Sequence, residues 1–250
     1  MKVSLLQKVF LFALLFAFAE MACCYLNAQA GFALHAFLLL ASLFLYSKTV
    51  GEEKRLWLFL ALVPVLKMLS TSLQLDFINN LQQTALVYVF FIPIAVLLFF
   101  TQGMPREFLL KRPRGFDLLA AIVFGTMLGL TEHLVLSRIA LITLGDAQQL
   151  AFLSAVMLFG VGFGSELVFR GMIQFQAEKL LGGLQGLLLA SILYGFMHIV
   201  WKSPLELFFA VFAGLVFGIL FQRTRNVYVV ALAHAVSKIM LFGVLSLYVF

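Results

Sequence analysis

The sequence predicts an all-α protein, a polytopic transmembrane helical bundle with eight or nine spans. Hydrophobic residues make up 64% of the 250 residues, charged residues only 11%, and the mean hydropathy is +1.09. A soluble domain would carry roughly 25% charged residues. The apolar runs do not alternate with polar residues as barrel strands do, and helices satisfy their backbone polar groups within the segment. These observations favour membrane-spanning helices.

Nine apolar segments follow one another along the chain, and most approach the ~20 residues that cross a bilayer. The sixth segment is longer, so we expect it to tilt or to project from the bilayer. The short stretch Trp201-Lys202-Ser203-Pro204 links the seventh segment to the eighth, which begins at its proline. An eight-span arrangement, with one segment re-entrant or the C-terminus inside, stays open. The nine segments cover residues 5–26, 30–47, 56–73, 84–101, 117–137, 148–180, 184–200, 204–222 and 227–249.

The distribution of basic residues favours a cytoplasmic N-terminus. In that orientation twelve Lys and Arg residues flank the spans on the inside and two on the outside, a strong positive-inside bias. The net charge of +6 then reflects topology and anionic lipid headgroups, and nothing indicates nucleic-acid binding. We therefore expect a multi-pass protein in the plasma membrane of a prokaryote. The inside residues are Lys2, Lys8, Lys48, Lys54, Arg55, Arg106, Lys111, Arg112, Arg114, Lys179, Arg223 and Arg225, and the outside ones are Arg138 and Lys202.

The first segment begins with basic residues, as a signal peptide does. Its apolar run is longer, and Glu20 lies where a cleavage site favours small neutral residues, so we expect a retained span. Cys23 and Cys24 are adjacent within this span. Neighbouring cysteines rarely form a disulfide with each other, so we expect two buried thiols that act as small hydrophobes.

The basic stretch 102–116 is predicted to be a cytoplasmic loop that separates a four-span region, 1–101, from a C-terminal domain, 117–250. Ionisable residues within membrane spans are rare and usually mark a working site. Most of them lie after the loop, so we expect any chemistry in the C-terminal domain. They are Glu132, His133, Glu166, Arg170, His198, His234 and Lys238, whereas Glu20, His35 and Lys67 precede the loop.

The first polar constellation combines a carboxylate with a guanidinium. Glu166 and Arg170 are four residues apart, so they share one helix face and are expected to form an ion pair. Glu166 is the stronger candidate for a function. Ser165 precedes it on the helix and reads as a packing residue, because no nearby base points to a serine nucleophile.

Two later segments add histidines. Glu166 and His198 lie equally far from the glycine turn between their segments, so an antiparallel helix pair would place them at similar depth. Tyr194 shares a helix face with His198. His234 and Lys238 share a face of the last segment, and a lysine at that depth needs a carboxylate partner, for which Glu166 is the candidate.

Two histidines and a carboxylate on different helices could bind a metal ion such as zinc and activate water, or could transfer protons without a metal. The candidate ligands are His198, His234 and Glu166. The ammonium of Lys238 would repel a divalent ion. The sequence contains no His-Glu-x-x-His motif, no glycine-rich phosphate loop and no cysteine cluster.

The three segments, in this order, resemble the CPBP family of CAAX-processing and bacteriocin-processing intramembrane proteases, also called the Abi family or type II CAAX prenyl endopeptidases. The family pattern is Glu-Glu-x-x-x-Arg, then Phe-x-x-x-His, then His-x-x-x-Asn or Asp. Here residues 165–170 read Ser-Glu-Leu-Val-Phe-Arg, residues 194–198 read Tyr-Gly-Phe-Met-His, and residues 234–238 read His-Ala-Val-Ser-Lys. The resemblance covers residues 150–245.

The resemblance implies an intramembrane endopeptidase that acts on a membrane-anchored or transmembrane protein or peptide. Three positions depart from the pattern. Ser165 replaces the glutamate that activates water, Lys238 replaces the Asn or Asp that helps to bind metal or to stabilise the oxyanion, and Tyr194 replaces Phe. A hydroxyl cannot serve as a general base at neutral pH. The matching positions are Glu166, Arg170, His198 and His234.

Three hypotheses stay open. The chain is a divergent endopeptidase in which Glu166 acts as base, His198 and His234 polarise the carbonyl or bind a metal, and Lys238 donates to the oxyanion. Alternatively it is a pseudoprotease that holds and regulates a partner protein, in which Lys238 pairs with Glu166 and no metal binds. A proton-coupled transporter ranks last, since inverted repeats with broken helices are not evident. The pair at residues 132–133 is expected to be a local structural or interfacial feature.

Overall fold

The computed structural model describes residues 4–73, 80–136, 141 and 146–245. Within these residues the secondary structure is helical, with no strand, and nine helices are long and apolar enough to cross a membrane. The all-α fold class is therefore confirmed, and the nine candidate spans agree with the eight or nine expected from the sequence. The spans are Leu5–Tyr25, Ala28–Lys48, Gly51–Ser72, Asn80–Thr101, Gly115–Leu136, Ala147–Leu181, Gly183–Trp201, Pro204–Thr224 and Val227–Leu245.

The chain divides into two compact units, and each unit is made of two stretches of sequence. The first unit comprises Met1–Ser72 and Val168–Gly218, and the second comprises Leu73–Leu167 and Ile219–Phe250. Two of the long helices therefore contribute to both units. The sequence predicts a different kind of division, into two domains separated by a loop at 102–116. The two compact units do not test that division, so it stays a prediction.

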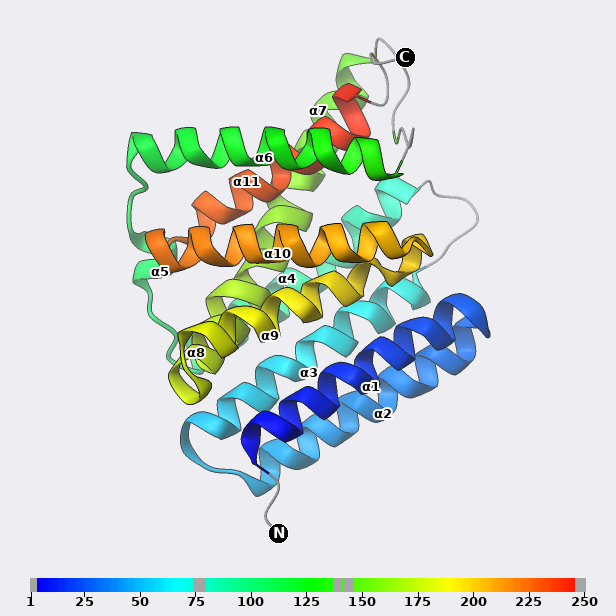
Figure 1. The fold of residues 1–250 in the computed structure, drawn as a ribbon, viewed down its shortest axis with the longest axis vertical. Coiled ribbons are helices and arrows are strands. Elements are labelled where there is room, and N and C mark those ends of the chain that lie inside the picture. Colours follow the sequence, from blue (N-terminus) through cyan, green and yellow to red (C-terminus); the bar gives the residue numbers. More distant parts are fainter. Residues whose placement is uncertain (1–3, 74–79, 137–140, 142–145, 246–250) are drawn as a thin grey trace. The chain divides into compact units, whose positions relative to one another are not determined.

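The N-terminal part of the first unit consists of α1 (Leu5–Tyr25), α2 (Ala28–Lys48) and α3 (Gly51–Ser72), which run side by side (Figure 1). Short connections join them, and capping residues mark the starts of α1 and α2. The Ser4 hydroxyl accepts a hydrogen bond from the backbone of residue 7, and the Asn27 side chain accepts one from the backbone of residue 30. Such caps satisfy amides that the helix itself leaves unpaired.

A buried ion network ties these three helices together. Glu20 on α1 lies 2.7 Å from the Nζ atom of Lys67 on α3 and 3.0 Å from the Nε2 atom of His35 on α2. The carboxylate and the imidazole are both almost fully buried. The three deep ionisable residues of the N-terminal half thus converge, and losing one of them would leave a buried charge without its partner.

The rest of the first unit is a helical hairpin followed by the start of α10. Gly182, with φ +100°, lies between α8 and α9 and adopts the turn that the sequence places there, a conformation that strains residues with a Cβ atom. The Gln174 amide donates a 3.1 Å hydrogen bond to the Gly218 carbonyl and so joins the first arm to α10. The elements are η2 (Leu167–Gln174, from Val168 on), α8 (Phe175–Leu181), α9 (Gly183–Phe196), η3 (Met197–Trp201) and α10 (Pro204–Thr224, to Gly218).

The second unit is built around α11 (Val227–Ile239). Figure 1 shows α11 crossing α6, and it also packs against η1. Glycines allow both helices to approach α11 closely. A Cβ atom at Gly125 of α6 would lie 2.5 Å from the carbonyl oxygen of Ala233. A Cβ atom at Gly162 of η1 would lie 2.6 Å from the carbonyl oxygen of Ala231. The other elements are α4 (Asn80–Thr101), α5 (Glu107–Leu110), α6 (Gly115–Leu136), α7 (Ala147–Ala155), η1 (Val156–Gly164) and η4 (Met240–Leu245).

The start of α11 is fixed by Asn226. Its side-chain oxygen accepts hydrogen bonds from the backbone amides of Tyr228 and Val229, which caps the helix. Its amide nitrogen donates a 2.6 Å hydrogen bond to the carbonyl of Lys111, in the stretch before α6. Both ends of the side chain are used, so α11 starts at a defined position within its unit.

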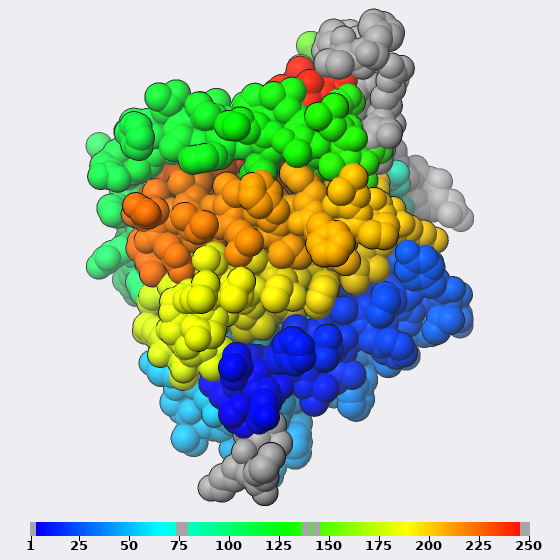
Figure 2. Space-filling view, viewed as in Figure 1, coloured from blue at the N-terminus to red at the C-terminus, as the bar shows by residue number. Residues whose placement is uncertain are grey.

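Large apolar side chains cover the outer surfaces of several helices. Figure 2 shows α1 in blue and α6 in green at the surface, and Phe10 on α1 and Leu134 on α6 are 59% and 83% exposed. Exposed apolar surface of this extent is unusual for a soluble protein but matches the hydrocarbon core of a bilayer. The chain is a multi-pass integral membrane protein by the length and composition of its helices.

Candidate active site

The first motif lies in the middle of an unusually long helix. Ala147–Leu181 runs for 35 residues without a break, which confirms the long sixth segment and corresponds to about 50 Å at α-helical rise. The helix widens to π-type geometry over Val156–Gly164 and over Leu167–Gln174. Stretches of this geometry are rare and occur frequently at functional sites. Here they flank Ser165 and Glu166 on both sides.

In the second unit the structure brings together Glu166 and His234. The Nδ1 atom of His234 lies 2.8 Å from Oε1 of Glu166, and both side chains are almost completely buried. Because a carboxylate accepts from an N–H group, the geometry assigns a proton to Nδ1, and Nε2 is the atom that gains or loses a proton. A carboxylate that orients an imidazole and balances its charge is the arrangement used in general acid–base catalysis.

Lys238 does not pair with Glu166, which corrects the pairing expected from the sequence. Its Nζ atom lies 2.5 Å from Oε1 of Glu132 on α6, and the Ser237 hydroxyl lies 3.5 Å from the other carboxylate oxygen. Lys238 stands one turn beyond His234 on α11, on the side that packs against α6. Glu132 lies outside the three motifs. It balances the charge of Lys238, the residue that stands where the family pattern has Asn or Asp.

Ser165 is engaged by a tyrosine from α4. The hydroxyl oxygens of Ser165 and Tyr88 lie 2.7 Å apart. Tyr88 packs closely over the glycines beside Ser165, because a Cβ atom at Gly164 would lie 2.7 Å from its ring. Ser165, which stands where the family pattern has its first glutamate, thus forms a buried polar contact that joins the long helix to α4.

Arg170, in the first unit, is fully buried among aromatic rings. Its guanidinium carbon lies 4.8 Å from the ring centre of Tyr194 and 5.7 Å from that of Phe217, and it donates a 2.9 Å hydrogen bond to the Gly214 carbonyl. Ring faces attract a desolvated cation. Glu166 belongs to the second unit, so its expected ion pair with Arg170 stays a prediction.

His198, also in the first unit, lies where α9 tightens into the 3₁₀ helix η3. Its Nδ1 atom is 3.2 Å from the carbonyl oxygen of Tyr194, one turn earlier, and the two rings are 5.0 Å apart. Tyr194 therefore contacts both Arg170 and His198 and organises the motif residues of this unit. The expectation that His198 and Glu166 lie at similar depth concerns both units and stays a prediction.

Sequence reasoning missed Glu206, which lies in the first turn of α10. Its side chain is fully buried, and one of its carboxylate oxygens lies within 4.8 Å of a ring nitrogen of His198. The signal was present in the sequence, because Glu206 is an acidic residue inside an apolar segment, and such residues are functional candidates by default.

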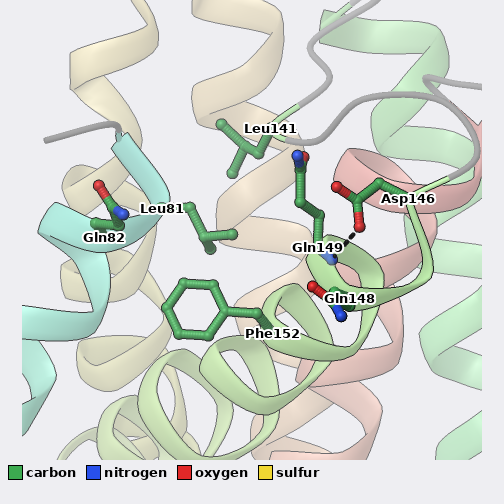
Figure 3. Close-up of a pocket in the computed structure, with 7 residues that line it drawn as sticks. All are labelled: Leu81, Gln82, Leu141, Asp146, Gln148, Gln149 and Phe152. Carbon is green, nitrogen blue, oxygen red and sulfur yellow. Dashed lines mark hydrogen bonds between the residues drawn. The ribbon is translucent and has the colours of Figure 1, made fainter.

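Two hollows open in the second unit. A cavity of about 340 Å³ lies at the start of α7 (Figure 3), where Oδ1 of Asp146 accepts a hydrogen bond from the backbone amide of Gln149, and its lining includes no motif residue. An apolar groove of about 410 Å³ lies between α4 and η1 and is lined by Tyr88, Phe159 and Gly160 among others. Through Tyr88, the wall of this groove is hydrogen-bonded to Ser165.

The third motif does not fit a divalent metal ion. Lys238 replaces a ligand with an ammonium group, and like charges repel strongly in a buried site. In addition, Oε1 of Glu166 is already used by His234 Nδ1 at 2.8 Å. The donor set of the second unit therefore suits proton transfer better than coordination of zinc.

Residues 147–240 match the family model described as type II CAAX prenyl endopeptidase Rce1-like. No curated protein and no solved structure matches the chain. The matched stretch begins at α7, ends at the start of η4 and contains all three motifs, in agreement with the resemblance over 150–245. Residues 147–240 of this membrane protein are a domain of the Rce1-like type II CAAX prenyl endopeptidase (CPBP) family.

Proposed function

We propose that this protein is an intramembrane endopeptidase that cleaves a membrane-anchored or transmembrane polypeptide. The observation that carries the proposal is the buried 2.8 Å contact between Glu166 and His234. An inactive relative has no need to keep a carboxylate–imidazole pair desolvated in a membrane domain, where unused ionisable groups are costly. The family domain supports a membrane protein as the partner.

His234 would act through its Nε2 atom. Protonated there, the ring donates a hydrogen bond to the oxyanion that forms at the scissile carbonyl, and then gives its proton to the amine nitrogen as the C–N bond breaks. Glu166 balances the charge of the ring and holds its orientation. The attacking water also needs a base, which Ser165 cannot supply, so a second carboxylate must do so.

The apolar groove between α4 and η1 supports a lipid-embedded partner. It opens in a helix surface suited to the bilayer, and the hydrogen bond from Tyr88 to Ser165 joins its wall to the first motif. The excess of basic residues on one side supports a cytoplasmic N-terminus, and the composition is compatible with a prokaryotic plasma membrane.

A second candidate function is that of a pseudoprotease that binds and regulates a membrane partner without cutting it. Two observations favour it. Ser165 replaces a catalytic glutamate, and Lys238 is paired with Glu132 at 2.5 Å. Both departures are accommodated by close contacts, as expected of a domain that has lost its reaction but kept its fold.

Crosslinking capture from native membranes tests the proposal, with the length of the captured partner read by mass spectrometry. We expect wild type to yield a shortened partner and Glu166→Gln to yield ~10²-fold less of it, since the amide no longer balances the imidazolium. Ser237→Ala, on the same helix as His234 but outside the proposed pair, is the control and should cut like wild type.

A partner captured at full length by both wild type and Glu166→Gln would establish the pseudoprotease. Equal shortening by both would also overturn the proposed role of the pair. Thermal unfolding of each purified variant in detergent checks that Glu166→Gln has kept its fold.

A further inference from the structure

A cluster of basic residues lies at one end of the second unit, on elements that the proposed function does not use. Figure 1 shows α5, in the connection between α4 and α6, beside the end of α10 and the start of α11. This part of the second unit contains two acidic residues, Glu107 and Asp117, and six basic ones. The six residues of this basic cluster are Arg106, Lys111, Arg112, Arg114, Arg223 and Arg225.

Direct contacts hold the α4–α6 connection against the turn between α10 and α11. The Asn226 amide donates a 2.6 Å hydrogen bond to the carbonyl of Lys111, and the Lys111 ammonium donates one of 3.5 Å to the carbonyl of Thr224. The rings of Phe108 and Phe221 pack edge to face, with their centres 5.1 Å apart. The basic residues of the two stretches are therefore parts of one surface.

The turn between α10 and α11 holds Arg225 in a left-handed backbone conformation. Its φ is +49°, a region that is unfavourable for residues with a Cβ atom. A glycine would make the same turn without strain but also without the charge. The guanidinium carbon lies 5.3 Å from the ring centre of Phe221, and ring faces attract cations. Strained backbone of this kind clusters at sites that hold a ligand.

The positive charge of the cluster is only partly balanced by the protein. Arg114 is balanced by Asp117, whose carboxylate lies 2.9 Å from its Nε atom. Lys111, Arg112 and Arg223 have exposed side chains. An excess of positive charge is thus present where the spans α4 and α10 end and where α6 and α11 begin. This surface is complementary to an anion at the boundary of the membrane.

Large apolar side chains lie next to these charges in the sequence. Leu110 directly precedes Lys111 and is 72% exposed, and Phe116 in the first turn of α6 is 75% exposed. Basic residues combined with exposed Leu and Phe are typical of segments that lie in the headgroup region with their apolar side chains among the acyl chains. A free phosphate ion would use only the charges, whereas a phospholipid uses both kinds of side chain.

We propose that the basic cluster binds the headgroup of an anionic phospholipid, with Leu110 and Phe116 against its acyl chains. Lys111 and Arg223 supply charge from the two stretches that meet here. An arginine fork also forms paired hydrogen bonds with phosphate oxygens. The inference goes beyond the proposed endopeptidase function, because no motif residue belongs to this site and its test measures lipid binding rather than cleavage.

Lipid titration of the full chain tests the proposal. The protein is purified in a non-ionic detergent and titrated with phosphatidylglycerol, and bound lipid is counted by native mass spectrometry. We expect at least tenfold tighter binding of phosphatidylglycerol than of zwitterionic phosphatidylcholine. Lys111→Gln combined with Arg223→Gln should weaken the binding ~25-fold, since each basic residue near an anionic headgroup contributes a factor of ~5.

A matched control removes the same amount of charge elsewhere. Lys48→Gln combined with Lys54→Gln changes two basic residues that flank the connection between α2 and α3 in the first unit. This variant should bind phosphatidylglycerol as wild type does. An equal loss of affinity in the control and in the cluster variant would mean that net charge alone attracts the lipid, and it would overturn the site.

Three further results would also overturn the proposal. The first is equal affinity for phosphatidylcholine and phosphatidylglycerol. The second is displacement of the lipid by millimolar glycerol 3-phosphate, which carries the phosphate without acyl chains and would identify a free phosphate ester as the ligand. The third is wild-type affinity in the folded cluster variant. If thermal unfolding shows that this variant has lost its fold, Arg112→Gln decides, with ~5-fold weaker binding expected and unchanged binding refuting the site.

Discussion

Separating the Lys238–Glu132 ion pair should strongly destabilise the second unit. The two side chains are 9% and 2% exposed, and the Nζ to Oε1 distance is 2.5 Å. Replacing only Lys238 with Met leaves a buried carboxylate, and replacing only Glu132 with Gln leaves a buried ammonium. Each of these charges would be buried between α6 and α11, where an unpaired charge is costly.

The expected magnitude follows from this burial. Removing one partner of a buried pair costs ~3–5 kcal/mol, whereas replacing both with uncharged residues is often nearly neutral. The double variant Lys238→Met with Glu132→Gln should thus be much more stable than the sum of the single variants predicts. A coupling free energy of ~3 kcal/mol corresponds to a factor of ~10² in the folding equilibrium.

A double-mutant cycle of equilibrium unfolding in mixed micelles measures this coupling. The pair Lys8–Glu53 provides the matched control, because its distance is 3.2 Å but its side chains are 34% and 29% exposed. Its coupling should be only ~0.2–1 kcal/mol, as for other partly solvated pairs. The contrast between the two cycles isolates the effect of burial from that of the charges themselves.

A coupling no larger than that of the control pair would refute the reasoning. The same variants also test whether Lys238 takes part in chemistry. If the pair is only structural, the double variant should fold and capture a shortened partner as wild type does. Loss of the shortened product from a folded double variant would mean that Lys238 donates to the oxyanion, as one of the hypotheses from the sequence holds.

Two further predictions concern packing. Gly125→Leu should destabilise the protein by ~1–3 kcal/mol, because its Cβ atom alone would lie 2.5 Å from the Ala233 carbonyl oxygen. Gly115→Ala is the control, since a Cβ atom at Gly115 would have no atom within 4 Å. In an unfolding titration this control should be nearly neutral. Arg170→Lys should lower the melting temperature, because an ammonium cannot reproduce the planar stacking on Tyr194, 4.8 Å away, and an unchanged melting temperature would contradict this.

The spans were predictable because each is a continuous apolar run bounded by charged or turn residues. The segment expected at 204–222 is Pro204–Thr224 in the structure, and the one expected at 5–26 is Leu5–Tyr25. The boundaries differ most where polar residues enter a helix end, as in α4, which begins at Asn80 rather than at residue 84. Hydropathy does not detect such ends, because a helix continues into the headgroup region without apolar residues.

The partners of the motif residues were not predictable in the same way. Lys238 and Glu132 are 106 positions apart, and Ser165 and Tyr88 are 77 positions apart. The i,i+4 rule identifies neighbours on one helix but does not identify which other helix covers that face. The expected pair of Lys238 with Glu166 was wrong for this reason.

Of the three departures from the family pattern, Ser165 and Lys238 are each matched by a contact of their own, and this limits what simple reversion can show. Lys238→Asn would restore the family residue but would leave Glu132 buried without its counter-charge. It must therefore be combined with Glu132→Gln before any change in cleavage can be interpreted. Ser165→Glu adds a carboxylate where Tyr88 now lies 2.7 Å from the hydroxyl, and that tyrosine can donate to it. The reversion at 165 is thus the better tolerated of the two, and it is the one that tests for a missing base.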